Sequence, residues 1–306
     1  MIKGLRNTKR KRNTSLVLER FSVVDLIIMI WITFLCLTCI LPFLHLIARS
    51  MSSSRAVLSN EVFFWPKEVN IDAYIRVFTS SLMMRQMVFT AILTVVQTTL
   101  ALIVTSLAAY PLSKRYLPGR YPITIAVMIT MYFTPGLIPT YLMYNDLGLL
   151  NSVWVLILPG VFSAYNMLIM RTYFMNAVPV ELEESAIIDG AGHFRIYLQI
   201  WLPLSKPVIA TIGLWVAVGR WNSFADSMWF TTDRYLQTLQ LLLYNMILSA
   251  RPSESFTGEA LMGLAPSAPE TLQAATIMFA TIPILLVYPF IQKYFVKGVM
   301  LGSVKG

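Results

Sequence analysis

The chain has 306 residues, of which 57% are hydrophobic and 13% are charged, and its mean hydropathy is +0.66. Soluble proteins carry about 25% charged residues, so the composition excludes an ordinary soluble domain and predicts an integral membrane protein. The net charge of +9 comes largely from basic residues beside apolar runs, and it therefore gives little support to nucleic-acid binding.

The first element is a basic segment at residues 1–22, which precedes the first apolar run. Seven Lys and Arg residues lie in its first twenty positions, and the positive-inside rule places such a segment in the cytoplasm. The apolar run that follows is longer than the about 7–15 residues of a signal-peptide core, so we expect a retained span. Its two cysteines, Cys36 and Cys39, are expected to be packing residues rather than a disulfide or a metal pair.

Six apolar runs are each long enough to cross about 30 Å of hydrocarbon as a helix. They occupy residues 23–48, 86–112, 122–143, 153–171, 207–230 and 271–295 and form one membrane domain at 23–295. Pro135, Pro159 and Pro283 lie inside three of these runs and predict kinks. The sequence therefore predicts an all-α membrane protein with six transmembrane helices.

The remaining basic residues set the expected orientation. Lys114, Arg115 and Arg120 lie between the second and third runs, on the predicted cytoplasmic side. Six spans return the C-terminal tail, residues 296–306, to the same side as the N-terminus. Both termini of this multi-pass protein are therefore expected in the cytoplasm.

Residues 176–206, between the fourth and fifth runs, are too polar to span a membrane and carry helix signals. Pro179 suits the first turn of a helix, and the glutamates after it place negative charge at the positive end of the helix dipole. Gly190 can adopt the left-handed conformation that ends a helix. A second apolar face then recurs with helical spacing at Phe194, Tyr197, Leu198 and Trp201. We expect a helix–turn–helix hairpin on the cytoplasmic side, and the alternative is an amphipathic loop on the membrane surface.

The hairpin also carries a motif with long, specific spacing. It begins at Glu184-Ser185-Ala186, continues three residues later with Gly190, and ends at Ile200, Leu202 and Pro203. This spacing resembles the EAA loop in the membrane subunits of bacterial ABC importers, with Ser185 in place of the usual alanine. The resemblance implies that the hairpin forms a coupling helix that docks into a cleft on a separate ATPase subunit. The residues assigned to ATPase coupling on this basis are Glu183, Glu184, Ser185, Ala186, Asp189, Gly190, Ala191, Ile200, Leu202 and Pro203.

The resemblance extends along nearly the whole chain, including the ending QKYFVKGVMLGSVKG. It is to the maltose-type, binding-protein-dependent inner-membrane components of carbohydrate importers, particularly their LplC-like branch. It implies the type I ABC importer permease fold, in the bacterial cell membrane, and import of an oligosaccharide rather than a peptide, a metal or an amino acid. It also implies alternating access, in which the hairpin carries a displacement of the ATPase subunits into the spans.

The same resemblance implies the partners of the chain. They are a second permease subunit, two ATPase subunits, an extracellular solute-binding protein and the carbohydrate itself, within membrane lipid. A heterodimer of permease chains is expected, with a homodimer as the alternative. ATP and magnesium belong to the ATPase subunits, so this chain is expected to be a non-catalytic subunit without a cofactor or metal of its own.

Three peripheral segments receive roles through the resemblance. The tail residues Ser303, Val304, Lys305 and Gly306 are expected to contact the ATPase pair, and the alternative is a solvated basic tail at the membrane. Two external segments are expected, 49–85 and 231–270, and the second is expected to be a polar loop rich in Ser, Pro and Gly. Each is either a plain connection or a contact for the solute-binding protein. We favour 231–270 for that contact.

Polar side chains inside apolar runs suggest a transport pathway, because they are costly in a membrane. In the fifth run Arg220 and Asn222 offer hydrogen bonds and Trp221 offers a flat apolar face to a sugar ring. The full set of candidate pathway residues is Arg220, Trp221, Asn222, Asp226, Tyr132, Thr134, Tyr165 and Asn166, and Gln97 and Thr130 could face the same cavity. The alternative is an inward-facing network that only holds the helices together.

Two other function classes, an intramembrane enzyme and a secondary transporter, are alternatives to an importer permease. The chain has no GxxxxGK[ST] phosphate loop, no HExxH and no GxSxG, so an enzyme has no recognisable constellation here. An ion-gradient-driven secondary transporter would need acids at the bilayer midplane and commonly an internal repeat. Asp25 and Asp226 are poor candidates for such acids, since one lies near the inner edge and one toward the outer half.

Overall fold

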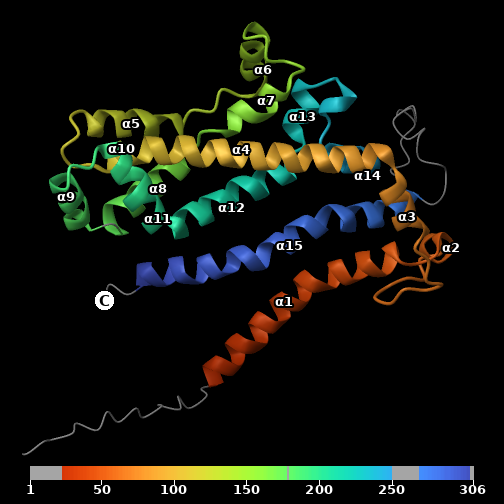
Figure 1. The fold of residues 1–306 in the computed structure, drawn as a ribbon. Coiled ribbons are helices and arrows are strands. Elements are labelled where there is room, and N and C mark those ends of the chain that lie inside the picture. Colours follow the sequence, from red (N-terminus) through yellow and green to blue (C-terminus); the bar gives the residue numbers. More distant parts are fainter. Residues whose placement is uncertain (1–22, 178, 250–268, 304–306) are drawn as a thin grey trace, which may run out of the picture.

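The computed structural model describes residues 23–177, 179–249 and 269–303, and all regular secondary structure in these residues is helical (Figure 1). The helices are α1 (Val23–Ser50), α2 (Ser54–Leu58), α3 (Asp72–Thr79), α4 (Ser81–Ser113), α5 (Arg120–Thr130), α6 (Leu137–Asp146), α7 (Val153–Ile157), α8 (Ala164–Ala177), α9 (Val180–Ile188), α10 (His193–Ile196), α11 (Leu202–Leu204), α12 (Lys206–Asn222), α13 (Ala225–Phe230), α14 (Leu239–Ser249) and α15 (Pro269–Ser303). Shorter 3-10 turns lie at Leu158–Gly160 and Arg234–Leu236, and a π-helical turn lies at Tyr197–Trp201.

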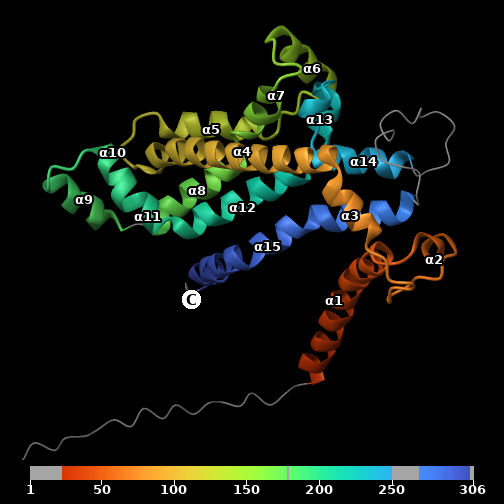
Figure 2. The same ribbon diagram turned by 45° about the vertical axis from the view of Figure 1, so that its right-hand side comes forward.

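Helix α4 is the central element, and α8 and α12 pack against it (Figure 1 and Figure 2). Small polar side chains such as Thr90, Thr94 and Ser106 are buried on it among the apolar ones. The Thr94 hydroxyl donates to the backbone oxygen of Thr90 at 2.7 Å, and other hydroxyls on α4 are bonded in the same way. Because the short side chains that bond in this way need no partner on another helix, they let neighbouring helices approach closely. The buried hydroxyl of Thr98, also on α4, has no such bond.

Buried apolar side chains gather in separate clusters along α4. At one end α3, α14 and α15 bury Val77, Leu239 and Phe279 against it. At the other end α8, α12 and the hairpin bury Phe174 and Trp201. A third cluster joins the middle of α4 to α7 and Phe230. The bundle is therefore built around one long helix that reaches from the hairpin to α14.

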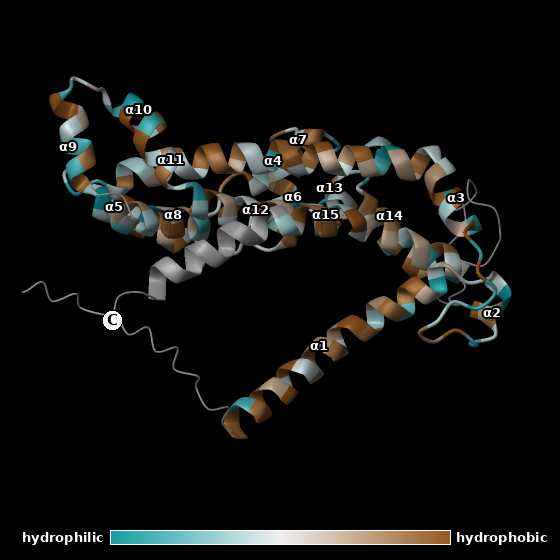
Figure 3. Ribbon diagram, turned by 60° about the horizontal axis from the view of Figure 1, so that its bottom comes forward, coloured by the Kyte–Doolittle hydropathy of each residue, from teal (hydrophilic) through white to brown (hydrophobic). Residues whose placement is uncertain are grey.

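Helix α1 diverges from this bundle and packs against α15 (Figure 1). Hydrophobic residues predominate along it (Figure 3), and none of its most apolar 18-residue stretch is buried. A helix that is apolar all round is covered by lipid or by another chain. Cys36 and Cys39 are exposed on α1, so the packing role expected for them is not performed within this chain.

The described helices include three that are long and apolar enough to cross a membrane, or up to five spans if two bent pairs each count as one. The single helices are α1, α4 and the part of α15 from Glu270 to Val287. The bent pairs are Val153–Gly160 with Ala164–Asn176, at 42°, and His193–Leu204 with Lys206–Asn222, at 79°. The count of six spans therefore stays a prediction.

The prolines expected to kink the spans behave differently from one another. Pro135 lies in the break between α5 and α6, next to Gly136, whose φ of +84° no regular helix contains. Pro159 lies in the 3-10 turn that separates α7 from α8. Pro283 lies inside α15, which continues past it without a break. Proline removes one backbone donor, and its neighbours decide whether the helix bends or ends there.

The predicted external segments contain more helix than expected. Within 49–85, α2 and α3 pack against α15, and α3 also contacts α4. Within 231–270, Leu239–Ser249 form α14, whose apolar side chains lie in the core. The expectation of a polar loop from 231 onward was therefore wrong for this helix, because its sequence LQLLLYNMIL is apolar. Residues 250–268, which carry the Ser, Pro and Gly, lie outside the described residues.

Candidate functional site

The first limb of the hairpin is α9. Pro179 precedes its first turn, and Glu181 and Glu183 lie in that turn as the sequence predicts. The helix ends at Asp189, and Gly190 has a φ of +79°, the left-handed conformation expected at this position. The N–H of Ala191 donates to the carbonyl of Ala186 at 2.9 Å, which closes the turn.

The second limb is a single helical segment, His193–Leu204, that runs through α10, the π-helical turn and α11 and meets α12 at 79°. Tyr197 and Trp201 of the predicted apolar face are buried, whereas Phe194 and Leu198 are exposed. The hydroxyls of Tyr197 and Ser106 lie 2.7 Å apart, and the ring of Trp201 meets that of Phe174 edge-on at 5.4 Å. These contacts join the second limb to α4 and α8.

A buried ion pair joins the first limb to the end of α4. Nζ of Lys114 lies 2.5 Å from a carboxylate oxygen of Glu183, and both residues are only 6% exposed. The same ammonium lies over the ring of Trp201 at 3.6 Å and over that of Tyr110 at 4.3 Å. The hydroxyl of Tyr116 donates to the other oxygen of Glu183 at 3.5 Å. Three aromatic rings thus surround one charge pair.

The environment of this pair changes its acid–base properties. Burial lowers the pKa of the Lys114 ammonium, and the hydrogen bond to Glu183 opposes that change. Burial raises the pKa of the Tyr116 phenol, and the negative charge of Glu183 raises it further. In the sequence analysis, Lys114 serves only to predict which side of the membrane this loop occupies. Nothing in the spacing of residues 114 and 183 reveals that the fold brings them together.

The coupling residues assigned from the motif divide between two faces of the hairpin. Glu184, Ser185 and Asp189 are exposed, and the neighbouring Ile187 and Ile188 are 48% and 85% exposed. Other members pack toward the membrane helices: Ala186, Ala191, Ile200 and Leu202. Glu183 belongs to this inward face through its ion pair. Pro203 is exposed within the short helix α11. An apolar outer surface flanked by acids is therefore available to a partner, and a hollow of about 220 Å³ lies between the limbs.

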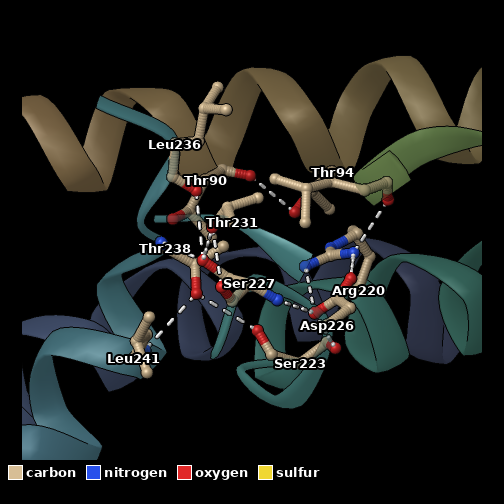
Figure 4. Close-up of polar contacts among 11 residues, drawn as sticks. Thr90, Thr94, Arg220, Ser223, Asp226, Ser227, Thr231, Leu236, Thr238 and Leu241 are labelled. Carbon is tan, nitrogen blue, oxygen red and sulfur yellow. Dashed lines mark hydrogen bonds and ion pairs between the residues drawn. The ribbon is translucent and has the colours of Figure 1, made fainter. Parts of the chain in front are cut away.

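A second polar site surrounds Arg220 at the end of α12. Its guanidinium donates through Nη1 to the carbonyl of Leu156 at 2.9 Å and forms a two-pronged ion pair with Asp226 (Figure 4). One oxygen of Asp226 also accepts from the hydroxyl of Ser223 at 2.8 Å and from the N–H of Ser227 at 3.0 Å. The network thus joins α12, α13 and α7, and Arg220 itself is 4% exposed.

The network continues from α13 to α4 and α14. The hydroxyl of Ser227 donates to the carbonyl of Leu236, and that of Thr238 donates to the carbonyl of Ser223 (Figure 4). The N–H of Leu239 donates to the hydroxyl of Thr90 at 2.9 Å. The expectation that this region holds helices together is supported, and one side of it also borders an open cavity of about 380 Å³.

The structure brings only part of the predicted pathway set to this cavity. Arg220, Asp226 and Gln97 line it. Trp221 is 6% exposed, lies in the core, and donates from its indole nitrogen to the carbonyl of Ala280 at 3.1 Å. That ring has no free face for a sugar in this conformation. The aromatic side chains that do line the cavity, Tyr144, Trp229 and Phe230, were missed in the sequence.

The other candidate residues lie elsewhere on the bundle. Asn222 is exposed and donates to the carbonyl of Val218, and Tyr165 stacks on Trp215. The remaining members lie on other surfaces or in partly buried positions: Tyr132, Thr134 and Asn166. The tail residue Ser303 ends α15, and residues 304–306 lie outside the described residues.

Comparison with known proteins identifies the class of this chain. Residues 121–301 match the family described as the binding-protein-dependent transport system inner membrane component. The polygalacturonan/rhamnogalacturonan transport system permease protein YtcP of Bacillus subtilis (strain 168) is 40% identical over 282 residues, which cover 92% of this chain and 98% of YtcP. Protein LplC of the same organism is 41% identical over 268 residues, 87% of this chain and 90% of LplC.

A solved structure agrees with these relatives. It is that of a bacterial ABC transporter involved in the import of the acidic polysaccharide alginate, and one of its chains matches with a TM-score of 0.81 and 31% identity. The match covers 90% of this chain and 99% of that one. The family, the relatives and the fold all agree with the resemblance carried by the hairpin motif. The chain belongs to the family of binding-protein-dependent transport system inner membrane components and has the fold of an ABC importer permease.

Proposed function

We propose that this chain is the permease subunit through which an ABC importer moves an oligosaccharide into a bacterial cell by alternating access. The observation that supports it most is the hairpin, whose motif spacing and exposed apolar tip combine with a buried attachment to α4. One relative, YtcP, is a permease protein of a polygalacturonan/rhamnogalacturonan transport system, and the structural match belongs to a transporter involved in alginate import. Membership of the binding-protein-dependent family does not support the ion-gradient-driven alternative.

The proposed partners follow from this role. Two ATPase subunits bind ATP and magnesium, a second permease chain completes the pathway, and a solute-binding protein delivers the sugar. The outer face of α9, around Glu184 and Ile188, is the proposed contact with an ATPase cleft. Residues 231–270 remain our proposed contact with the binding protein, and residues 303–306 our proposed second contact with the ATPase pair. Both termini are proposed to lie in the cytoplasm.

The hairpin can transmit motion to the membrane helices only if it is stiff. A lever transmits displacement only if it does not deform before its load moves, and bistable packed elements carry such motion better than loops. The Lys114–Glu183 pair fixes the first limb to α4, and Tyr197 and Trp201 fix the second. A displacement of the hairpin tip is therefore passed to α4, which reaches the opposite end of the bundle.

The test of this proposal is reconstitution with candidate partners in liposomes. Uptake is measured for oligogalacturonides, alginate oligosaccharides and neutral malto-oligosaccharides, together with ATP hydrolysis stimulated by the loaded binding protein. We expect uptake of at least one saccharide to require ATP and all partner subunits. Uptake that follows a proton or sodium gradient without ATP would refute the proposal.

A further inference from the structure

The cavity beside Arg220 lies midway along the central helix. Gln97, which lines it, is sixteen residues from each end of α4, so it lies about 24 Å from the hairpin end of that helix. The floor is formed by buried side chains of α4, α7 and α12. The rim is more open, since Trp229 is 46% exposed. A cavity of about 380 Å³ falls in the size range of small-molecule sites, about 300–1,000 Å³.

Two buried polar atoms of the lining residues have no partner within the protein. They are Oε1 of Gln97, a residue 7% exposed, and Nε of Arg220, a residue 4% exposed. Buried polar groups in native proteins are almost always hydrogen-bonded, so each such atom calls for an explanation. One is an acceptor and the other is a donor. A hydroxyl group can both donate and accept, and therefore matches this combination.

The position of Gln97 is built into the fold. A Cβ atom at Gly160 would lie 1.7 Å from Nε2 of Gln97, so only glycine leaves room for the amide in its present place. The turn that contains Gly160 also carries Pro159, which lines the same cavity. Glycine at this position thus leaves space for the amide of Gln97 beside the cavity.

Aromatic rings also line the cavity. Tyr144 and Trp229 line the cavity, and both pack edge-on against Phe230, at 5.0 Å and 6.4 Å between ring centroids. Packing against a shared ring limits how far each can rotate. A lining that combines aromatic rings with a few polar atoms suits a ligand with an apolar face and a polar edge.

The charged residues that line the cavity do not favour an ionic ligand. Arg220 is paired with Asp226 by two contacts, and Asp226 accepts further bonds from Ser223 and Ser227. The described lining therefore has no uncompensated charge to attract a phosphate or a metal ion. The unpaired atoms suit an uncharged hydroxyl.

We propose that this cavity binds one pyranose residue of the transported oligosaccharide, with a sugar hydroxyl between Gln97 and Arg220 and the ring against Trp229. The proposal rests on the proposed import function and adds the place where the sugar is held within this chain. It replaces Trp221 by Trp229 as the aromatic surface of the pathway. It also assigns the Arg220–Asp226 pair a positioning role, because the pair fixes the direction of Nε.

The test uses the complete transporter in liposomes and the member of the saccharide panel that the wild type takes up fastest. Gln97→Met removes the acceptor and keeps the length of the side chain, and Trp229→Ala removes the ring. We expect each to raise the KM for uptake by about tenfold, since one lost interaction with the sugar corresponds to about that factor. Trp229→Phe, which keeps a ring, should recover most of the loss.

The matched control is Trp215→Ala, a tryptophan of similar exposure, 43%, that stacks on Tyr165 outside the cavity. It should leave the KM within twofold of wild type. Purification of Gln97→Met and Trp229→Ala in complex with the partner subunits, at the yield of the wild type, checks that both variants are folded and assembled. If both keep a wild-type KM while the wild type transports, the cavity assignment is wrong and the import function stands. A wild-type complex that takes up no saccharide would overturn both.

Discussion

At the residue scale, the Lys114–Glu183 pair connects the motif to the membrane helices. Taking two charges out of water is costly, and the aromatic rings of Trp201 and Tyr110 offset part of that cost through cation–π contact. The motif glutamates therefore have different environments. Glu183 is buried against α4, and Glu184 is exposed and available to a partner.

The first prediction concerns this pair. Glu183→Gln should destabilise the permease by about 3–5 kcal/mol, because it leaves the Lys114 charge buried without its counter-charge. The measurement is the free energy of unfolding of the detergent-purified complex. The double variant Lys114→Met/Glu183→Leu, which removes both charges, should recover most of this loss.

A matched control is the exposed pair of Lys67 and Glu61, whose side chains are 54% and 55% exposed and whose charged atoms lie 3.4 Å apart. Glu61→Gln should change the free energy of unfolding by less than about 1 kcal/mol, as solvent screens such pairs. Equal effects of the two substitutions would show that the buried pair has no special role.

At the element scale, the hairpin ends its first helix in a conformation that glycine adopts without strain. Gly190 has a φ of +79°, whereas the nearby Gly192 has a φ of −73°, which any residue can adopt. Neither glycine has an atom within 4 Å of an added Cβ, so backbone conformation alone distinguishes them. The angle between the two limbs depends on the first of them.

The second prediction follows from that difference. Gly190→Ala should cost about 1–2 kcal/mol of strain in the hairpin and lower the number of sugars taken up per ATP hydrolysed. Gly192→Ala should leave that ratio unchanged. The ratio is measured in liposomes by parallel uptake and phosphate-release assays. Equal ratios in the two variants would contradict a rigid turn at Gly190.

The sequence predicts elements whose signals are local. Pro179, the first-turn glutamates and Gly190 are neighbours along the chain, so the bounds of α9 follow from them. The cavity could not be predicted in this way. Gln97, Tyr144, Arg220 and Trp229 lie on four different helical elements, and only packing decides that Trp221 turns into the core while Trp229 faces the cavity. Helix α14 was not predicted because its apolar run, Leu239–Ser249, is too short to cross a membrane and lies next to a stretch rich in Ser, Pro and Gly.

At the scale of the whole molecule, this chain exposes large apolar surfaces at two separate places. Helix α1 exposes apolar side chains on all faces, and the hairpin tip exposes Ile187 and Ile188. Surfaces of this kind are buried in lipid or against partner subunits. Helix α4 runs from the hairpin past α7 and α13 (Figure 1) and carries Gln97 of the cavity lining, so one continuous helix joins the proposed sites of energy input and sugar binding.

The third prediction tests the central claim, that ATP hydrolysis on a partner reaches the membrane helices through the hairpin. Ile188→Cys, in a background where the exposed Cys36 and Cys39 are replaced by serine, is crosslinked in the assembled complex with and without ATP. We expect a crosslink to the ATPase subunit whose formation blocks uptake of sugar. If Ile188→Cys does not crosslink to the ATPase subunit under any nucleotide condition while uptake is intact, the hairpin tip is not the contact that couples ATP hydrolysis to transport.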